Sequence, residues 1–493
     1  MLIAYEAYIA QKNKIHGAII QLAQDYNICR QFVYILLQKF IEFLPLVFST
    51  SKEIEKLSKK EVIKSILSYR FEGGMSIAAI STVMKRQRLD YSGKSTISQS
   101  LSTIGALLPS IKSIPVDKDF KITALLDEIF IGSSPILITV EPKSSVILNI
   151  ELAQSRDGKT WSEHIDYLRL NTKINIINTV SDEGRGILAG IKNTLPMADR
   201  QPDTFHAISH RLGLWVSNLE KKAYASIENE YDREAVCLSR KTQKIFDKQY
   251  TLYIEACEES IKAIEIYENF SYLYRHTIKQ LHPFHSNGEI RDASRATKEI
   301  DTALELIESL EHKKINTEIK SIKKILPQLL NYFEQSKKAI KVCKSLGISD
   351  NAIKTLSLAW QWDKAVIKAK NRDRKTKAKQ QRSFYLESAK HILGDRFESI
   401  KTKVFDELDN IIQASSMVEN INSILRPYLD RSKNQVTQEF LNLFAFYHNH
   451  RVYQSGKRKG KTPMEILTGE KQDKDWIELL LKFIEAENPS FFI

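Results

Sequence analysis

Apolar residues recur at helical spacing along the first 105 residues and form two similar helix–turn–helix patterns. In the first, "IHGAIIQLAQDYNICRQFVYILLQKF", Ile19, Leu22 and Ala23 share one apolar face. The "DYN" that follows makes a turn, and a second helix begins near Arg30. This pattern predicts two helices joined by a tight turn.

The second pattern is "SIAAISTVMKRQRLDYSGKSTISQSLSTIG", with "DYSGK" as its turn. Ser76 and Ser95 stand where the caps of its two helices are expected. In DNA-binding units of this kind the second helix enters the major groove, and its first residues meet base edges. Two such patterns in tandem, beside the basic run "KRQR", favour DNA binding over ordinary helical hairpins. The candidate DNA contacts are Arg30, Gln31, Lys94, Ser95, Thr96 and Gln99.

The pattern changes after "ALLPSIKSIPVDKDF", whose Pro109 and Pro115 mark a linker. The runs "KITALLDEIFIG", "PILITVEP" and "SVILNIELAQS" are short and β-branched, with Gly, Ser and Pro between them, so they predict three consecutive strands. A helix in "TWSEHIDYLRL", a strand in "INIINTVSDEG", a helix from Gly186 to Asn193 and a short last strand in "PDTFHAI" follow. This order of elements is that of an RNase H-like α/β core.

Helical spacing returns from about residue 207 to residue 415 and predicts an all-helical domain. Only two glycines and two prolines fall between Leu214 and Ile392. The most basic stretch of this region is Lys364–Arg382. It is as typical of a solvated helix face as of a surface that contacts phosphates.

Composition narrows the class of protein. The 493 residues are 42% hydrophobic and 27% charged, which is typical of a soluble chain with several domains. The net charge of +13 favours a polyanionic partner such as nucleic acid, with general solubility as the alternative. Four widely spaced cysteines without a CxxC pair indicate neither a disulfide framework nor a zinc site. We expect a cytoplasmic protein without a membrane span, because signal-peptide features and an apolar run of roughly 20 residues are missing.

Three acidic residues stand in positions that call for an explanation. Asp127 interrupts the apolar strand "TALLDEIFIG", where an unpaired buried carboxylate costs several kcal/mol. Asp182 follows the fourth strand directly before a glycine-rich turn, where it could also cap a helix. Glu419 lies on the amphipathic segment "SSMVENINSILRPYLDRSKN", where an ordinary surface role is the alternative.

If the three acids converge, their repulsion requires cations, and Mg²⁺ suits a site made of carboxylates. Two such ions can assist phosphoryl transfer. Glu128 and Glu183 are rivals for the same roles because each adjoins a chosen aspartate. Since neighbours on a strand face opposite sides, only one of Asp127 and Glu128 can point into the site.

The chain resembles the DDE transposases of bacterial insertion sequences. The resemblance rests on "LLDEIFIG", "VSDEGRG", "DTFH", "VENINSILRPYLDRSKNQVTQEFLNLFAFYHNHR" and "GKRKGKTPMEILTG". The separations are 55 residues from Asp127 to Asp182 and 237 residues from Asp182 to Glu419, and the second implies a long helical insertion. The fold so implied is an α/β RNase H-like core with a large all-α insertion domain and N-terminal helix–turn–helix domains.

The resemblance also implies an activity. Asp127, Asp182 and Glu419 would hold two Mg²⁺ ions, for which Mn²⁺ substitutes, while double-stranded DNA is cleaved at the ends of a mobile element and joined to target DNA. A homodimer or higher oligomer on DNA is expected, in the bacterial cytoplasm or nucleoid. The alternatives are an inactive or domesticated DNA-binding relative, a nuclease that only hydrolyses, and a helical scaffold.

Several residues outside the three acids are further candidates for contact with DNA or for the active site. Arg426 resembles a phosphate-gripping residue of some of these enzymes. We also expect DNA contacts from basic residues near the C-terminus, namely Lys433, Lys457, Arg458 and Lys459. His206 could orient a phosphate or water, or be structural. Trp161 and Trp215 could stack on bases or belong to the core. The run "HNH" at 448–450 could suggest a metal site, but it fits the C-terminal segment of the family better.

The predicted organisation has six parts. They are helix–turn–helix domains at 1–50 and 51–108, the first part of the core at 116–206, a helical insertion at 207–408, the catalytic glutamate helix with the following helix at 409–450, and a basic C-terminal segment at 451–493.

Overall fold

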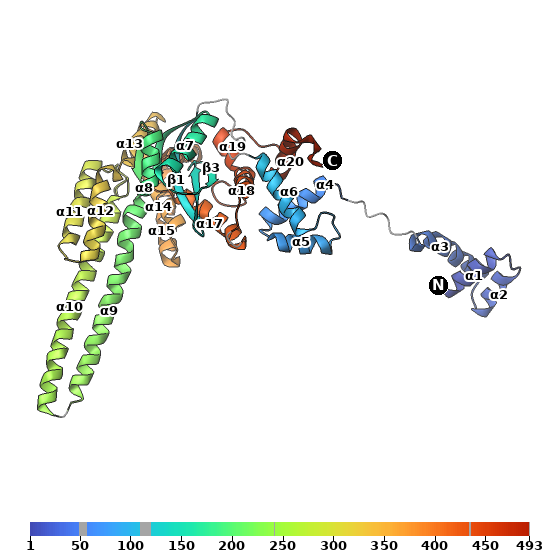
Figure 1. Cartoon of the computed structure of the whole chain (residues 1–493), viewed down its shortest axis with the longest axis horizontal. Coiled ribbons are helices and arrows are strands. Elements are labelled where there is room, and N and C mark those ends of the chain that lie inside the picture. Colours follow the sequence, from blue (N-terminus) through green and yellow to red (C-terminus); the bar gives the residue numbers. More distant parts are fainter. Residues whose placement is uncertain (49–56, 109–119, 241, 433–434, 493) are drawn as a thin grey trace. The chain divides into compact units, whose positions relative to one another are not determined.

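The computed structural model describes residues 1–48, 57–108, 120–240, 242–432 and 435–492 (Figure 1). Its contacts divide the chain into two units, one of Met1–Ile97 with Phe492–Ile493 and the other of Ser98–Phe491. The predicted linker prolines, Pro109 and Pro115, lie outside the described residues.

The first helix–turn–helix pattern forms three helices around a small apolar core. The helices are α1 (Leu2–Lys12), α2 (Ala18–Asp25) and α3 (Arg30–Phe48). Ala7, Ala23, Val33 and Leu37 are buried between them. The predicted turn and the start of the second helix at Arg30 are confirmed.

The second pattern forms α4 (Lys59–Leu67), a π-helical turn (Ser68–Glu72), α5 (Ile77–Arg86) and α6 (Lys94–Leu107). Ser76 caps α5 as predicted, because its side chain accepts a hydrogen bond from the Ala79 amide at 3.2 Å. The predicted cap at Ser95 is wrong. The helix already begins at Lys94, so Ser95 lies within its first turn.

One mixed sheet of five strands follows, in the order β3-β2-β1-β4-β5. The strands are β1 (Phe120–Ile131), β2 (Ser134–Val140), β3 (Ile147–Leu152), β4 (Ile174–Ser181) and β5 (Asp199–Pro202). The first three pair antiparallel, whereas β4 and β5 join β1 in parallel register. The helices α7 (Gly158–Asn171) and α8 (Arg185–Thr194) lie between β3 and β5 in the chain, as predicted.

The last strand lies earlier than the sequence indicated. Of the predicted strand segment "PDTFHAI", only Pro202 belongs to β5, and Phe205–His210 form a π-helical turn. The reason is Asp203, whose side chain accepts hydrogen bonds from the Phe205 and His206 amides and so ends the strand.

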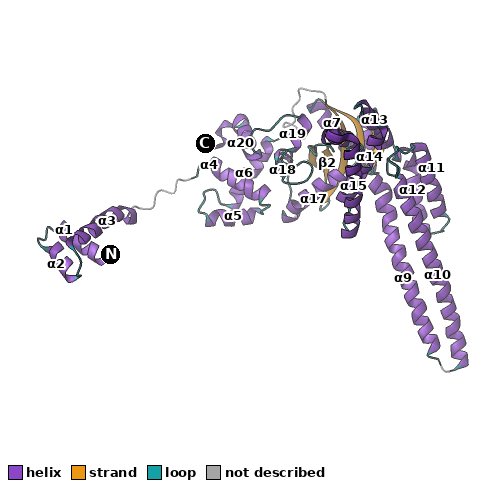
Figure 2. Cartoon of the chain, turned by 180° about the vertical axis from the view of Figure 1, so that it is seen from behind, coloured by secondary structure: helices purple, strands orange, loops and turns teal. Residues whose placement is uncertain are grey.

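Both faces of the sheet are covered by helices (Figure 2). Alternate residues of β1, including Ala124 and Leu126, pack with Trp161 of α7 and Ile187 of α8 in one apolar cluster. The helices α17 (Ser416–Arg431) and α18 (Gln438–His450) contact β1, β2 and β3.

Two side chains of α18 protect the edge strand β3. Asn449 bonds to the amide and the carbonyl of Ile147 at 2.9 and 3.0 Å. Gln438 bonds to the Leu152 amide and the Ile150 carbonyl at 2.8 and 2.9 Å. The backbone groups of β3 that could pair with a further strand are therefore hydrogen-bonded within the chain. The "HNH" run has this structural role, and His448 is buried with Nε2 at 2.9 Å from the Ser145 carbonyl.

Residues 211–408, within the predicted helical insertion, consist of packed helices. They are α9 (Arg211–Leu238), α10 (Gln243–Gln280), α11 (Ala293–Glu308), α12 (Lys313–Leu329), α13 (Tyr332–Ser345), α14 (Asp350–Lys368), α15 (Arg372–Leu393) and α16 (Phe397–Leu408), with a 3₁₀ turn at Gly394–Arg396. They enclose a second apolar core. The predicted combination of an α/β part with an all-helical part is confirmed in this form.

The C-terminal part adds α19 (Pro463–Thr468), α20 (Trp476–Glu487) and a 3₁₀ turn (Pro489–Phe492). Pro463 occupies the first turn of α19, which a capping box between Thr462 and Glu465 begins. No helix in the described ranges is long and apolar enough to cross a membrane.

The contact between α7 and α8 offers a test of the packing on this side of the sheet. A Cβ atom at Gly190 would lie 2.5 Å from the Cβ of Trp161. Gly190→Ala is therefore expected to lower the free energy of unfolding by about 1–3 kcal/mol, despite the better helix propensity of alanine. Thermal denaturation beside Lys192→Ala, an exposed change on the same helix, checks this, and equal midpoints would contradict it.

Candidate active site

Asp127, within β1, and Asp182, directly after β4, lie at the same level of two adjacent parallel strands. Leu126 of β1 is paired with Ser181 of β4, and the two aspartates are the next residues along each strand. Asp182 is not the cap of α8, which begins after Gly184. Its side chain instead accepts a hydrogen bond from the Gly184 amide at 2.9 Å and so shapes the turn after β4.

The helix α17 places Glu419 and Asn422 beside the two aspartates. Asn422, one turn after Glu419, donates a hydrogen bond from Nδ2 to Oδ2 of Asp127 at 3.1 Å. Oε1 of Glu419 lies 3.0 Å from Nε2 of His206, which belongs to the π-helical turn after β5. The structure thus brings together Asp127, Asp182, Glu419 and His206, which the sequence had singled out.

The pKa of the Asp127 carboxyl reflects its burial and the charges of the cluster. Burial raises the pKa of its carboxyl to about 7, against a lowering by the hydrogen bond from the Glu128 amide. The negative charges of Asp182 and Glu419 contribute to this raised pKa, and the charge of His206 opposes it. Both acids therefore lie near enough for their charges to act on Asp127.

The two neighbouring glutamates are paired with arginines, whereas the two chosen aspartates are not. Glu128 forms an ion pair with Arg156 at 2.7 Å, and Glu183 forms one with Arg200. Within the described part of the chain, Asp127 and Asp182 have no ion pair with a basic residue. Glu128 also faces the α7 side of the sheet, opposite to Asp127, as strand alternation requires.

Arg156 is a residue of the site that no sequence pattern singled out. The hydrogen bond and charge of Glu128 raise the pKa of its guanidinium, and the charge of Asp182 adds to this. Its side chain is largely exposed, and it lies over the Phe130 ring. No local pattern marks it, since its partners are distant in the chain.

Asp203 connects the turn that carries His206 to the helix that carries Glu419. It is buried, and Oδ1 accepts hydrogen bonds from the Phe205 and His206 amides at 2.8 and 3.1 Å. Its other oxygen accepts from the amide and the hydroxyl of Ser415, at the start of α17, at 2.7 and 2.5 Å. One carboxylate therefore orients both His206 and the helix that carries Glu419. The motif "DTFH" contains this residue, but no feature of the motif distinguishes it from its neighbours.

The donors of this cluster match Mg²⁺ in type. They are carboxylate oxygens, and Oδ1 of Asn422 adds a buried oxygen that has no hydrogen-bond partner among the described residues. Among the residues that the structure describes, however, no group of three or more His, Cys, Asp or Glu side chains stands close enough to form a ready-made metal site.

The predicted DNA contacts of the helix–turn–helix units lie at the surface. Arg30 and Gln31 are exposed in the first turn of α3, and Lys94, Ser95 and Gln99 are exposed on α6, with Thr96 half-buried. Arg426 is exposed on α17, seven residues after Glu419. The helix runs on through Pro427 to Arg431, so the proline does not end it. Lys433 lies outside the described residues.

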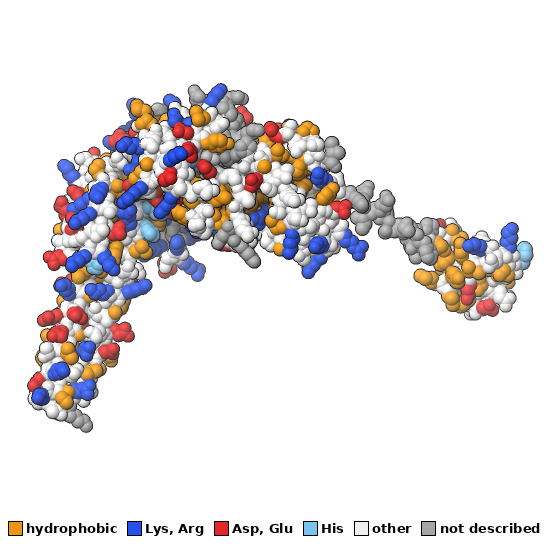
Figure 3. Space-filling view, viewed as in Figure 1, with side chains coloured by type: hydrophobic (Ala, Val, Ile, Leu, Met, Phe, Trp, Pro, Cys, Tyr) orange, Lys and Arg blue, Asp and Glu red, His pale blue; other side chains and the backbone are white. Residues whose placement is uncertain are grey.

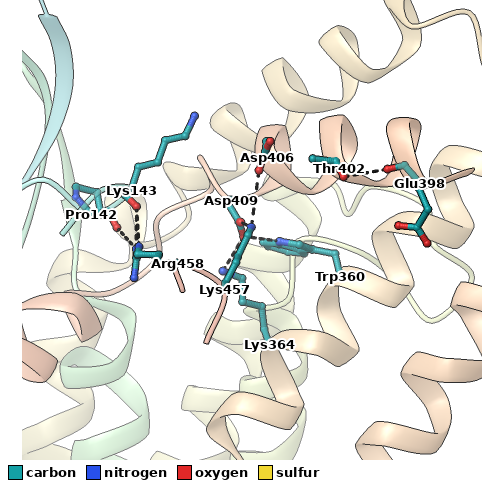
Figure 4. A network of polar contacts seen from close by, with 10 residues as sticks. All are labelled: Pro142, Lys143, Trp360, Lys364, Glu398, Thr402, Asp406, Asp409, Lys457 and Arg458. Carbon is teal, nitrogen blue, oxygen red and sulfur yellow. Dashed lines mark hydrogen bonds and ion pairs between the residues drawn. The ribbon is translucent and has the colours of Figure 1, made fainter. Parts of the chain in front are cut away.

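The basic tail is tied to the rest of the protein (Figure 4). Lys457 forms an ion pair with Asp409, which also bonds to Lys364 and to Nε1 of Trp360. Arg458 donates to the carbonyls of Pro142 and Lys143 at 3.1 and 2.8 Å. Lys459 is exposed. Lys457 and Arg458 thus have a structural role, and their contact with DNA stays a prediction.

The two tryptophans belong to cores. Trp161 is fully buried beneath the sheet, so the alternative that it stacks on a base is wrong. Trp215 is partly buried against the helical core, with its ring 5.0 Å from that of His312.

A basic surface follows the end of α14. Lys370, Arg372, Arg374, Lys375, Lys377 and Lys379 are exposed there, and within the described residues none of them forms an ion pair. Burial lowers the pKa of Lys368, the last residue of α14, and the charge of Asp203 raises it. The end of α14 is therefore near the residue that organises the acid cluster.

Comparison of the sequence with models of known protein families gives no match, and comparison with curated proteins gives none either.

The raised pKa of Asp127 predicts a pH-dependent stability. In the metal-free protein the folded state keeps this proton up to about pH 7, whereas the unfolded chain releases it near its ordinary pKa of 3.8. Stability therefore decreases as the pH rises through this window, by at most on the order of 4 kcal/mol. Asp127→Asn is expected to remove that decrease and to melt above the wild type at pH 8 in a chelator.

Thermal denaturation between pH 4 and 8 measures this difference. Asp199→Asn, an exposed change on β5, is the matched control and should follow the wild type. Parallel curves for Asp127→Asn and the wild type would contradict the prediction.

Proposed function

We propose that this protein is a DDE-type transposase that cleaves DNA at the ends of a mobile element and joins the freed ends to target DNA. The observation that carries the proposal is the cluster of Asp127, Asp182 and Glu419, from three separate elements, on one side of the sheet. Its two aspartates form no ion pair with a basic side chain among the described residues, while Glu128 and Glu183 beside them are each paired with an arginine.

The strand order supports an RNase H-like core. Three antiparallel strands at one edge, two parallel strands added at the other, and helices between the later strands are the arrangement expected of that fold. A long helical block then separates the last strand from the helix of the third acid. This is the architecture that the resemblance to DDE transposases implies.

The chemistry proposed is phosphoryl transfer in two steps. In the first, water attacks a phosphorus atom, the bond to the 3′-oxygen breaks, and a 3′-hydroxyl and a 5′-phosphate result. In the second, that 3′-hydroxyl attacks a target phosphodiester and displaces its 3′-oxygen. Two Mg²⁺ ions, or Mn²⁺ in their place, would supply Lewis-acid stabilisation of the attacking and leaving oxygens when bound.

The residues themselves supply ligands and orientation. Asp127, Asp182 and Glu419 would hold the ions, and Asp203 fixes the helix of Glu419 and the turn of His206. His206, within hydrogen-bond distance of Glu419, can accept or donate a proton at Nε2 toward a water or a phosphate oxygen. Arg426 and Arg156 can contact phosphates on either side of the acids.

DNA binding is supported by three surfaces. The exposed first turns of α3 and α6 suit the major groove, and the cations after α14 suit a phosphate backbone that leads to the acids. We propose that the protein acts on paired ends as a homodimer or higher oligomer in the bacterial cytoplasm.

Cleavage of the natural substrate tests the proposal. A labelled duplex of the DNA that flanks the gene is incubated with and without Mg²⁺ or Mn²⁺. Asp182→Asn is expected to reduce nicking by about a thousandfold or more, because a metal ligand is removed. Glu183→Gln is the matched control, since this neighbour is paired with Arg200, and it should retain cleavage.

The products separate the alternatives. Joined strands would identify a transposase, and nicking without joining would indicate a nuclease of the same fold. Binding without cleavage in either metal would favour a DNA-binding relative without chemistry.

The basic surface after α14 yields a second test. Charge reversal at Arg374, Lys375 and Lys377 to Glu is expected to weaken DNA binding and to flatten the dependence of log affinity on log salt by about 0.9 for each phosphate that the protein no longer neutralises. Lys313, Lys314 and Lys320 to Glu, exposed changes on α12, are the matched control. Fluorescence anisotropy across a salt series measures both, and equal slopes for the two variants would reject the assignment.

A further inference from the structure

The helices α9 and α10 form a long antiparallel hairpin, here called the arm (Figure 1). With 28 and 38 residues they are roughly 42 and 57 Å long at 1.5 Å per residue. Their register is set by two hydrogen bonds, from Tyr267 to Glu220 and from Ser260 to Glu230.

The arm is joined along a seam of small side chains. The residues buried between Glu220 and Glu268 are Ala223, Cys237, Ala256, Ser260 and Ala263. Small side chains let the two helices approach closely but bury little apolar area. The large apolar side chains of this stretch therefore lie elsewhere.

Each helix of the arm carries an exposed apolar stripe. On α9 the stripe is Tyr224, Ile227, Tyr231 and Leu238, and on α10 it is Tyr250, Ile254 and Ile261. Successive members are three, four or seven residues apart, the spacing of one helix face. Their exposed fractions range from 38% to 74%.

Both stripes face the same side of the arm. Successive residues of a helix are rotated by about 100° around its axis. Counted in the direction of increasing residue number, the stripe of α9 is rotated by roughly 100° from its seam residues, and the stripe of α10 by roughly 140°. The two helices run in opposite directions and their seam residues face each other. Rotations of the same sense about the two axes therefore bring both stripes to the same side of the arm. The hydrogen bond between Ser260 and Glu230 also places the two stripes at similar heights along the arm, and together they are here called the apolar face.

The charge of the arm argues against nucleic acid as the occupant of that face. Between residues 220–238 and 250–268 there are ten carboxylates and only four lysines and arginines, in a chain whose net charge is +13. The free end is different, with Arg240, Lys244 and Lys248 against Asp247. Figure 3 shows carboxylates along the middle of the arm and cations toward its end.

We propose that the apolar face docks on the same face of a second copy of this chain. A two-fold axis across the face would place the arms antiparallel and complete a four-helix bundle. With the axis near Cys257, Lys244 and Lys248 at the free end of each arm would then lie beside Glu265 and Glu268 of the other copy, and this charge complementarity selects this partner and this orientation. The proposal does not depend on the chemistry of the acid cluster.

Sedimentation velocity of the full-length protein without DNA tests this docking. The wild type is expected to be dimeric at micromolar concentrations, and Tyr231→Glu with Ile261→Glu to raise the dissociation constant by about a hundredfold or more. Asn229→Glu with Lys262→Glu adds the same two acids on the opposite side of the arm and should leave the dimer intact. Unchanged circular dichroism of both variants shows that the arm is folded.

Crosslinking tests the orientation. Cys257 lies near the middle of the apolar face, so in an antiparallel pair the two copies of this thiol approach each other. In a Cys29→Ser background, a short bismaleimide is expected to yield a covalent dimer, and Cys257→Ser is expected to abolish it. A monomeric wild type, a dimer indifferent to Tyr231→Glu with Ile261→Glu, or crosslinking that survives Cys257→Ser would overturn the proposal.

Discussion

The carboxylate of Asp203 is the interaction on which the candidate site depends. It lies where β5 ends, accepts two amides of the following turn with one oxygen, and accepts the amide and hydroxyl of Ser415 with the other. A buried carboxylate is stable only when its hydrogen-bonding capacity is used, and here four donors use it. Since Ser415 directly precedes α17, this one carboxylate joins two segments that are 212 residues apart.

The same region explains how a large helical insertion leaves the site intact. Gln201 of β5, also buried, donates to the Leu329 carbonyl and accepts from the Tyr332 amide, so the insertion is fastened to the sheet beside Asp203. The chain leaves the sheet after Asp203 and returns at Ser415, the residue that the same carboxylate binds. The insertion can therefore be long without changing where Glu419 lies.

Charge is distributed unevenly around the acids. Arg156 and Arg200 neutralise Glu128 and Glu183, whereas the pKa of Asp127 is raised by burial and by its acidic neighbours. Structural acids are normally paired, and an acid left with a raised pKa beside other acids is typical of functional sites. Away from the acids, the helical insertion carries a group of cations after α14 and an excess of carboxylates on the arm. Its charge is therefore unevenly distributed.

The sequence by itself determined the kinds of elements and their order, because apolar periodicity and turn residues are local signals. It also determined that Asp127 and Glu128 face opposite sides, since this follows from the strand alone. Only the tertiary structure decided which acids are neutralised, that Asp203 organises the site, that β5 ends at Pro202, and that Lys457 and Arg458 hold the tail. Each of these depends on partners far apart in the chain, and no pattern within one segment records which distant segment will supply them.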